Sequence, residues 1–433
     1  MKQFLTFWTV VCLLPFALPA QHGWTVCNAP AFSNRVDDIF MADAQTGYAV
    51  SGDGQIVKTT NGGTNWLLLN QDDSVYYRSV EFTTTQKGFV GGFPIYLTPT
   101  ENVLQKTTDG GATWTDLTPL LDSYARSGGI CGLAAPDSNT IYGCGNWYQD
   151  TAYIVKSTDG GATWSYIDMH QYATSLIDMY FVNKDTGFAT GTGPLPLETA
   201  VILYTTDGGA TWTYKFQNTV ASEYCWKIQR LDSLNYFASI EDFNTQPPSI
   251  VRSVDGGMSW TQLTVQIPSY NIEGVGFIDS LHGWTGGGFV FSFETQDGGQ
   301  TWDTIHVIDA FNRFFRVSDT VAFATGMQIW KYNPALTGIH PEPNTPAVYS
   351  TLNVYPNPVN EVLTVHWGLA QPTRAMLTLY DLNGRPVLTI ENAIKPKGEY
   401  QDQVNIAGLP AGSYLLVLKT HEDKQVVQVV VTH

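Results

Sequence analysis

Charged residues are scarce in this chain of 433 residues. Lys, Arg, Asp and Glu make up 14% of the sequence, and 22 of them are Lys or Arg. The formal net charge is −17, and a surface of this sign repels a phosphate backbone, so we expect no nucleic-acid partner. A diffuse negative charge also has a simpler role, because it keeps a protein soluble.

The sequence lacks the spacing patterns of several kinds of site. Its Cys and His residues are not spaced as metal ligands, and its Gly pairs do not precede an expected helix, as a phosphate-binding loop would. No Ser occupies a nucleophile elbow. We therefore expect no bound metal and no cofactor.

Long apolar runs are also missing, except at the N-terminus. Lys2 is followed by an apolar run over residues 4–18, and small residues close the segment. This is the order of a secretory signal, and the run is too short for a stable membrane anchor. We predict a signal peptide over residues 1–20, cleaved between Ala20 and Gln21.

Cysteine is rare, with five residues in the chain, and Cys12 leaves with the signal peptide. The others enter an oxidising compartment, where disulfides form. Cys131 and Cys144 flank a turn and are expected to face each other on a hairpin, so they are favoured as a disulfide over Cys27 and Cys225. The alternative is that both stay reduced, because a bridge across two paired strands is strained.

Glycine and aromatic residues are abundant, with 40 Gly, 13 Trp, 22 Tyr and 21 Phe. This composition is typical of all-β chains rich in turns, and we expect no long helices.

An eight-residue segment recurs along the chain, and successive copies are 48, 50, 48, 48 and 42 residues apart. Residues 107–114 read Thr-Thr-Asp-Gly-Gly-Ala-Thr-Trp. The acidic or amide position of the six copies is held by Asn61, Asp109, Asp159, Asp207, Asp255 and Asp297, and the last position by Trp66, Trp114, Trp164, Trp212, Trp260 and Trp302.

Each copy lies between two alternating runs, which predicts a hairpin turn. The Asp and the hydroxyl residue two positions before it can hydrogen-bond to turn amides, the Gly pair supplies positive φ, and the Trp packs on a neighbour. We therefore expect these Asp residues to be structural rather than catalytic or metal-binding.

A second landmark, an aromatic residue opening another strand, occurs seven times, at Tyr48, Phe89, Tyr142, Phe188, Phe237, Trp284 and Phe323. The seventh unit lacks its last strand, and residues 23–26 resemble the strand that follows each turn. We predict that residues 21–333 form a seven-bladed β-propeller, closed by its N-terminal strand.

These repeats match the Asp-box of sialidase-type (BNR) propellers, S/T-x-D-x-G-x-x-W, in five full copies and one near copy. Their number and order resemble the photosystem II assembly-factor-like propellers of secreted bacterial proteins, over about 310 residues. The resemblance implies a binding scaffold, and the assembly activity itself is not carried over.

A different composition begins after the repeats. Residues 334–350 are rich in Pro and lack periodicity, which is typical of a linker. Residues 351–433 contain seven alternating runs, which predict a small Ig-like β-sandwich. Residues 354–358, 379–384 and 408–414 resemble the landmarks of the type IX secretion system C-terminal (type A) sorting domain.

The second resemblance implies a partner and a location. A chain with this domain engages the type IX secretion machinery of a Bacteroidetes-type cell, crosses the periplasm and outer membrane, and is released or attached to surface lipopolysaccharide. We expect a secreted or cell-surface protein.

Four arginines fall at the expected starts of innermost strands in contiguous blades, and they are Arg35, Arg78, Arg126 and Arg313. Guanidinium groups bind carboxylates bidentately, so this set predicts a site for an anionic, peptide or glycan ligand. The alternative is that each Arg pairs with a nearby acid such as Asp37, Asp38 or Glu81.

An enzyme is the rival class, because sialidases and xyloglucanases carry the same repeats. Glycoside hydrolysis needs two converging carboxyl groups, or a Tyr nucleophile in sialidases. The candidates Asp38, Asp178 and Glu273 come from different blades, and residues 35–37 read Arg-Val-Asp where sialidases have Arg-Ile-Pro. Xyloglucanases of this type need two propellers. We predict a non-enzymatic scaffold.

Overall fold

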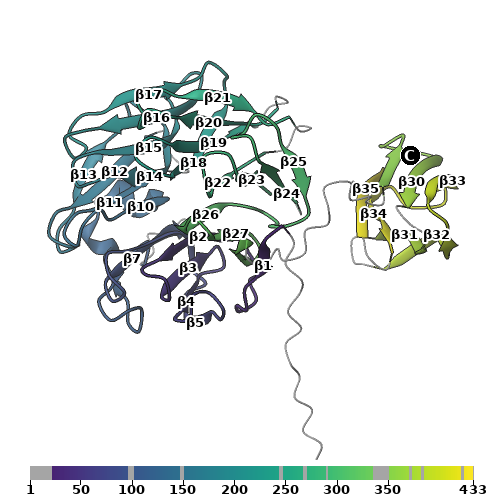
Figure 1. Cartoon of the computed structure of the whole chain (residues 1–433), viewed down its shortest axis with the longest axis horizontal. Coiled ribbons are helices and arrows are strands. Elements are labelled where there is room, and N and C mark those ends of the chain that lie inside the picture. Colours follow the sequence, from purple (N-terminus) through teal and green to yellow (C-terminus); the bar gives the residue numbers. More distant parts are fainter. Residues whose placement is uncertain are drawn as a thin grey trace, which may run out of the picture. The chain divides into compact units, whose positions relative to one another are not determined.

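The computed structural model describes ten stretches of the chain, residues 22–95, 102–146, 151–242, 247–266, 271–288, 291–334, 351–369, 373–381, 385–420 and 424–432. The predicted signal peptide and its cleavage site between Ala20 and Gln21 lie outside these stretches. The chain divides into two compact units, Met1–Gly338 and Ile339–His433, so the division falls within the predicted linker. Strands dominate both units (Figure 1).

The first unit contains seven four-stranded antiparallel sheets, which we number in chain order. Sheet 1 has β2 (Val36–Met41), β3 (Gly47–Ser51), β4 (Gln55–Thr59) and β5 (Leu67–Gln71); sheet 2 has β6 (Val75–Phe82), β7 (Gly88–Pro94), β8 (Leu104–Thr107) and β9 (Thr115–Asp116); sheet 3 has β10 (Gly132–Ala134), β11 (Ile141–Gly145), β12 (Tyr153–Ser157) and β13 (Ser165–Asp168).

The remaining sheets repeat this order. Sheet 4 has β14 (Ser175–Phe181), β15 (Gly187–Thr192), β16 (Ala200–Thr205) and β17 (Thr213–Gln217); sheet 5 has β18 (Glu223–Arg230), β19 (Tyr236–Asp242), β20 (Ser249–Ser253) and β21 (Thr261–Thr264); sheet 6 has β22 (Gly274–Phe277), β23 (Gly283–Gly286), β24 (Ser292–Thr295) and β25 (Asp303–Ile305); sheet 7 has β26 (Arg313–Ser318), β27 (Val321–Thr325), β28 (Ile329–Tyr332) and, from the start of the chain, β1 (Trp24–Val26).

Sheet 7 combines both ends of the unit. Strand β1 pairs antiparallel with β28, with Trp24 opposite Tyr332 and Val26 opposite Trp330. Trp24 is buried and meets Trp284 of sheet 6 edge to face, with ring centroids 5.2 Å apart. The N-terminal strand therefore shares a core with two sheets formed by the last part of the unit.

The first strand of each sheet contacts the first strands of its neighbours. These contacts run from β2 through β6, β10, β14, β18, β22 and β26, and β26 also contacts β2. In Figure 1 the sheets surround a common centre, with strands such as β14, β18, β22 and β2 nearest to it. The architecture is all-β and propeller-like.

The Asp-box turns join the third and fourth strands of sheets 1 to 6. In sheet 2 the Thr107 hydroxyl donates to Asp109 (2.8 Å) and accepts the amide of Gly111 (2.9 Å), while Asp109 Oδ1 accepts the amide of Thr113 (2.9 Å). Gly110 and Gly111 have φ of +72° and +87°, a region that favours glycine. Each turn is thus specified by its own eight residues.

The turns are also attached to the preceding sheet. Lys58 of sheet 1 donates to the carbonyl of Gly110 in sheet 2 (2.7 Å). Tyr48 stacks on Phe82 with centroids 3.6 Å apart, and Phe82 meets the Asp-box Trp114 edge to face at 6.3 Å. Two further sheet pairs repeat this aromatic sequence, with Tyr142, Phe181 and Trp212, and with Phe237, Phe277 and Trp302.

The second unit has seven strands in two sheets. One sheet has the order β29 (Thr351–Tyr355), β30 (Val362–Leu369) and β33 (Gly398–Asn405); the other has β32 (Pro386–Lys395), β31 (Thr373–Asp381), β34 (Gly412–Lys419) and β35 (Lys424–Val431). Trp367 of the first sheet and Leu379 and Leu416 of the second belong to one buried cluster. The two sheets therefore share a core.

Helical structure is limited. The described residues contain a 3-10 turn, η1 (Thr118–Leu120), and one short helix, α1 (Ser123–Gly128), both between sheets 2 and 3. In the part of the chain that the structure describes, no helix has the length and apolar character needed to span a bilayer.

Candidate functional site

Three of the four predicted arginines lie on or beside innermost strands. Arg35 precedes β2, Arg78 lies within β6, and Arg313 begins β26. Arg126 does not join them. It lies in α1, where its Nε and Nη2 donate to the carbonyls of Leu121 (2.8 Å) and Pro119 (3.0 Å).

The position of Arg126 corrects the prediction that all four arginines lie at the starts of innermost strands. Asp122 caps α1 by accepting the amide of Tyr124 (2.9 Å), so a helical turn stands where the other sheets begin their first strand. Strand β10 starts six residues after Arg126, at Gly132. The short helical insertion between sheets 2 and 3 therefore places Arg126 before the first strand of sheet 3 and not at its start.

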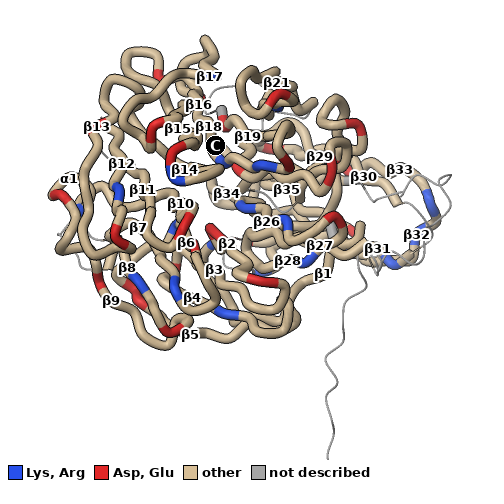
Figure 2. Tube along the Cα trace, turned by 60° about the vertical axis from the view of Figure 1, so that its left-hand side comes forward, with Lys and Arg blue, Asp and Glu red and all other residues tan. Residues whose placement is uncertain are grey.

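The innermost strands carry a bulge that sets the direction of their side chains. The register shifts between Val36 and Asp38 in β2 and between Tyr77 and Ser79 in β6. Strands β14 and β18 shift at the equivalent place. Because a bulge re-aims a side chain, Asp37 and Arg78 occupy equivalent extra positions in neighbouring sheets. Figure 2 marks the acidic positions on β2 and β6.

Asp37 joins two of the arginines. Its Oδ1 lies 2.8 Å from Arg35 Nη2 and 3.0 Å from Arg78 Nη1, and it also accepts Nδ2 of Asn312 at 2.8 Å. Arg35 reaches further, with Nη1 bonded to Glu273. Arg35 and Arg78 are therefore both paired with a nearby acid, as the alternative interpretation predicted.

Arg313 forms a second layer of ion pairs. Its Nε donates to Asp38 (2.6 Å), and its Nη1 and Nη2 donate to the two oxygens of Asp178 (2.7 and 3.1 Å). Asp38 and Asp178 thus converge on one guanidinium, although their positions in the sequence did not predict this. Both are buried and charge-paired, so neither is an available acid or nucleophile.

Arg78 keeps one edge of its guanidinium unpaired. Arg78 is 5% exposed, and its Nε and Nη2 have no hydrogen-bond partner among the described residues. These two nitrogens lie on the same side of the planar group, the side that binds a carboxylate with two parallel hydrogen bonds. The guanidinium carbon lies 5.3 Å from the ring centroid of Trp226 and 5.9 Å from that of Phe93.

A buried acid on β19 interacts electrostatically with Arg78. Glu241 of β19 is 4% exposed, and burial, followed by repulsion from Glu273, raises its pKa to about 8. Its Oε2 has no partner among the described residues. Glu241 is therefore largely uncharged at neutral pH. Sequence inspection missed it, because nothing in the local sequence of β19 signals its burial.

Lys227 adds a cation that the sequence did not indicate. It is among the fully buried side chains, and no hydrogen bond of its ammonium group occurs within the described residues. Burial, with repulsion from Arg313, lowers its pKa to about 8. We call Arg35, Asp37, Arg78, Lys227, Glu241 and Glu273 the inner cluster.

A cavity of about 340 Å³ lies at the other ends of the innermost strands. Its lining includes Asp38, Glu81, Tyr180, Arg230 and Arg313. Burial and the nearby charge of Asp38 raise the pKa of Glu81 well above its ordinary value. Burial thus favours the uncharged form of the Glu81 carboxyl group.

The Asp-box carboxylates are fully engaged in their turns. Hydrogen bonds from Thr113 and Thr107 lower the pKa of Asp109 to about 2, and hydroxyl groups four residues on lower those of Asp207, Asp255 and Asp297 to about 2 as well. The pKa of Asp159 is lowered by Thr163 in the same way. Asn61 bonds the amide of Asn65 (2.9 Å).

The predicted disulfide is absent, since Cys131 and Cys144 are both free, buried thiols. The register places Gly132, not Cys131, opposite Cys144, and a Cβ built on Gly132 would lie 3.1 Å from Cys144 Sγ. The residue expected to face Cys144 is therefore displaced by one position. Cys27 and Cys225 are also free.

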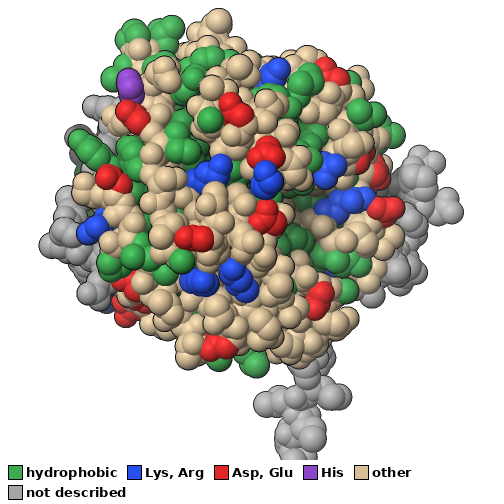
Figure 3. All heavy atoms as spheres, turned by 90° about the vertical axis from the view of Figure 1, so that its left-hand side faces the viewer, with side chains coloured by type: hydrophobic (Ala, Val, Ile, Leu, Met, Phe, Trp, Pro, Cys, Tyr) green, Lys and Arg blue, Asp and Glu red, His purple; other side chains and the backbone are tan. Residues whose placement is uncertain are grey.

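Surface charge is mixed rather than concentrated on one face of the protein. On the face seen in Figure 3, acidic and basic side chains are interspersed with hydrophobic and uncharged ones. Within the described residues, no group of three His, Cys, Asp or Glu side chains could hold a metal ion.

Two family models match separate parts of the chain. Residues 353–432 match the secretion system C-terminal sorting domain, and residues 156–270 match the photosynthesis system II assembly factor YCF48. No curated protein matches the sequence.

Several solved structures share the fold. A structure of YCF48 bound to D1 peptide is 19% identical, covering 73% of this chain and 98% of that chain with a TM-score of 0.53. YCF48 from Cyanidioschyzon merolae is 18% identical, covering 72% of this chain and 99% of that chain, with a TM-score of 0.54. The GH74 xyloglucanase from Xanthomonas campestris is 10% identical, covering 94% and 67%, with a TM-score of 0.53.

At these identities the structural likeness establishes the fold alone. The sorting domain indicates export and a secreted or cell-surface location. The chain thus combines a BNR-type propeller unit similar to YCF48 with a secretion system C-terminal sorting domain.

Proposed function

We propose that this protein is a non-enzymatic binding scaffold, exported by its C-terminal domain, that holds a carboxylate-bearing peptide segment at the inner cluster. In this proposal the seven sheets act as one closed propeller with β1 as the closing strand, and the second unit is an Ig-like sandwich. The inner cluster supplies the recognition, and the sheets supply the rigid frame.

The unpaired edge of Arg78 carries the proposal. Leaving two charged N–H donors buried without acceptors is costly, and a carboxylate would satisfy both with a bidentate pair. The rings of Trp226 and Phe93 flank the guanidinium, so an entering carboxylate would be shielded from water, where charge-assisted hydrogen bonds are stronger.

The surrounding charges favour an anion at this edge. Glu241 is largely neutral at pH 7, and Lys227 retains most of its charge there. Asp37 is already shared between Arg35 and Arg78. A carboxylate beside Arg78 would therefore meet cations that are not fully compensated.

A peptide is the ligand class that the comparisons favour. The YCF48 structure that shares this fold has a D1 peptide bound, and a peptide carries carboxylates at acidic side chains and at its C-terminus. We infer that the ligand here is an extended protein segment with at least one such group.

The binding test uses the full chain and a library of acidic peptides, each made with a free carboxylate and with the carboxyl group amidated. We expect Arg78→Gln to weaken binding on the order of 30-fold and to abolish the preference for the free carboxylate. Arg78→Lys keeps the charge but loses the bidentate edge, so we expect partial loss.

Arg126→Gln is the matched control, because Arg126 bonds only carbonyls of its own loop. Unfolding midpoints of all variants identify any that fail to fold. Failure of every peptide to bind, or equal binding by wild type and Arg78→Gln, would refute the proposal.

The export part has its own test. We propose that residues 351–433 engage the type IX secretion machinery after periplasmic transit and leave the protein released or attached to lipopolysaccharide. Removing this segment should retain the propeller unit in the periplasm of a type IX-competent cell. Export of the shortened chain would contradict the assignment.

A glycoside hydrolase of sialidase-like or xyloglucanase-like type is the second candidate. Glu241 has the raised pKa of a general acid, and Glu273 is close enough to contribute to that shift. Glu273 is bonded to Arg35, however, which disfavours its use as a nucleophile. Turnover of a glycan by the wild type, lost in Glu241→Gln, would favour the hydrolase over the scaffold.

A further inference from the structure

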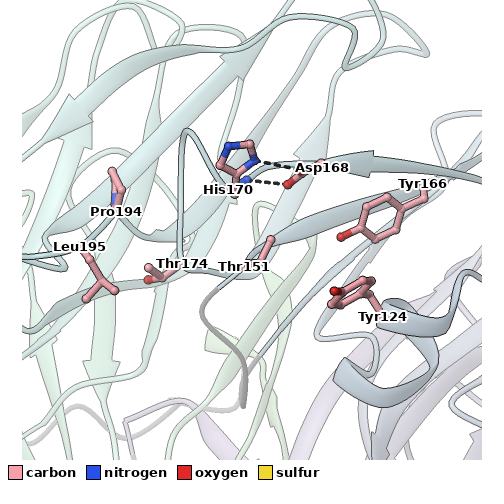
Figure 4. A pocket seen from close by; sticks show the side chains of 8 residues that line it. All are labelled: Tyr124, Thr151, Tyr166, Asp168, His170, Thr174, Pro194 and Leu195. Carbon is pink, nitrogen blue, oxygen red and sulfur yellow. Dashed lines mark hydrogen bonds and ion pairs between the residues drawn. The ribbon is translucent and has the colours of Figure 1, made fainter.

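A second cavity lies away from the inner cluster, where loops of sheets 3 and 4 meet. Its volume is about 540 Å³, within the range of small-molecule sites. Its lining includes Tyr124 of α1, Tyr166 and Asp168 of β13, and His170 and Leu195 from loops (Figure 4). None of these residues belongs to the inner cluster. We call this cavity the tyrosine groove.

The two tyrosines form a supported aromatic platform. Their ring centroids lie 6.4 Å apart with an interplanar angle of 38°. Tyr166 rests on the buried ring of Tyr153, at 5.6 Å and 32°, and the Tyr153 hydroxyl donates to the carbonyl of Gly129, the C-cap residue of α1. The platform is thus fixed from behind, while Tyr124 remains 57% exposed.

The hydroxyl groups of the platform are available to a ligand. Neither Tyr124 nor Tyr166 donates a side-chain hydrogen bond to another described residue. In Figure 4 both hydroxyls lie on the side of their rings that faces Thr151. Burial and the charge of Asp168 raise the pKa of Tyr166 to about 12, so its hydroxyl remains a donor at neutral pH.

Asp168 and His170 form a fixed polar pair on the same lining. Asp168 Oδ1 accepts the amide of His170 (2.9 Å), and Oδ2 lies 2.8 Å from His170 Nδ1. When Nδ1 donates, the neutral ring keeps Nε2 as an acceptor. The pair therefore presents a carboxylate and a ring nitrogen at defined positions.

The chemistry of this lining fits an uncharged, polar ring. No Lys or Arg is among the described residues that line the groove, and the carboxylate of Asp168 would repel an anion. A pyranose presents C–H groups on its faces, which pack on aromatic rings, and hydroxyl groups at its edge, which match Tyr, Asp and His. We propose that the tyrosine groove is a second binding site, and that its ligand is a neutral oligosaccharide.

The test screens the full-length chain against a glycan array and then titrates cellohexaose, laminarihexaose, xylohexaose and maltohexaose by calorimetry. We expect a neutral glycan to bind, and we expect Tyr124→Ala and Tyr166→Ala each to lower its affinity about tenfold or more. Leu195→Ala, a change at an exposed lining residue, should give a smaller loss.

Matched controls separate this site from other surfaces and from the inner cluster. Tyr355→Ala removes a tyrosine of similar exposure, 51%, in the second unit, and Leu197→Ala removes an exposed leucine two residues from Leu195. Both should bind the glycan as the wild type does. Arg78→Gln should also keep glycan binding while losing acidic peptides, so the two proposals fail independently.

Three outcomes would overturn the inference. They are no binding of any neutral glycan at millimolar concentration, unchanged affinity in both tyrosine variants, and tighter binding of an oligogalacturonate than of every neutral glycan. The last outcome would show that the groove selects anions.

Discussion

Arg313 and Asp178 form a bidentate ion pair across the centre of the first unit, with N–O distances of 2.7 and 3.1 Å. Arg313 begins β26 in sheet 7, and Asp178 lies on β14 in sheet 4. Asp178 is fully buried, and its other hydrogen bond comes from the amide of Ile228 in sheet 5 (3.1 Å). One guanidinium thus connects sheets that are not neighbours.

We expect Arg313→Met to lower the free energy of unfolding by about 3–5 kcal/mol, because it leaves the buried carboxylates of Asp38 and Asp178 without the guanidinium that pairs with both. Urea denaturation of the full chain measures the change. Arg126→Met, at a half-buried arginine that bonds only carbonyls of its own loop, should have a smaller effect, about 1 kcal/mol. Equal stability of Arg313→Met and wild type would show that the pair is not needed.

Binding of an acidic peptide at the inner cluster should weaken as the pH rises through about 8. Glu241, whose pKa is about 8, gains a negative charge in this window, and Lys227, whose pKa is also about 8, loses a positive one. Both changes disfavour an anion beside Arg78, while Arg35, whose pKa is raised by Asp37 and Glu273, keeps its charge.

The measurement is the peptide dissociation constant between pH 6 and pH 9. Glu241→Gln should bind the peptide at both pH 6 and pH 9, with a smaller difference between the two dissociation constants than the wild type. The pH dependence that remains in this variant comes from Lys227. An affinity that is constant across pH 8 in the wild type would place the peptide elsewhere.

Thr107→Val should destabilise the first unit by about 1–3 kcal/mol, because the change keeps the shape but leaves the amide of Gly111 without its acceptor. Thr107 is 1% exposed, so water does not replace the lost hydroxyl. Thr115→Val, on the exposed side of β9, serves as the control in thermal unfolding. A similar midpoint for the two variants would argue against the turn as a source of stability.

The contact between His22 and Glu294 should make attachment of the N-terminal strand pH-dependent. His22 Nδ1 lies 3.1 Å from Glu294, whose hydrogen bond raises the pKa of His22 above 6.5. Because the pKa of His22 is higher in the folded state, the contact stabilises the attached strand fully below pH 6.5. This stabilisation is lost as the pH rises through the raised pKa of His22. Amide exchange of β1 should therefore accelerate with pH beyond its intrinsic dependence.

Glu294→Gln should remove that extra acceleration. His282, which lies 2.8 Å from the other oxygen of Glu294, would lose a partner in the same variant. His282→Asn therefore serves as the control, because it keeps the contact between His22 and Glu294.

Local features were predictable from the sequence, since their causes lie within a few residues. An Asp-box turn is specified by hydrogen bonds among positions 107, 109, 111 and 113. The aromatic landmark that opens the second strand of each sheet occurs seven times, from Tyr48 to Phe323, and its count yielded the number of sheets in the first unit. The landmarks of residues 354–358 and 408–414 identified the sorting domain in the same way.

The site was less predictable, because its contacts join residues far apart in the chain. Arg313 and Asp178 are separated by 135 positions, and Arg35 and Glu273 by 238. The short helical insertion α1 explains the misplacement of Arg126, and the pairing register of β10 with β11 explains the mismatch of Cys131 with Cys144. Sequence spacing cannot detect such a shift.

Strand β1 has a consequence for the order of folding. Thr25 bonds the carbonyl of Lys331, 306 residues further along the chain. A chain emerging from its N-terminus therefore holds β1 without its partner until nearly the whole unit has been made, because β28 is the last strand of the unit to be synthesised. Contacts this distant in sequence form slowly, so the nascent protein has a long interval in which the unpaired β1 is open to another chain or to a chaperone.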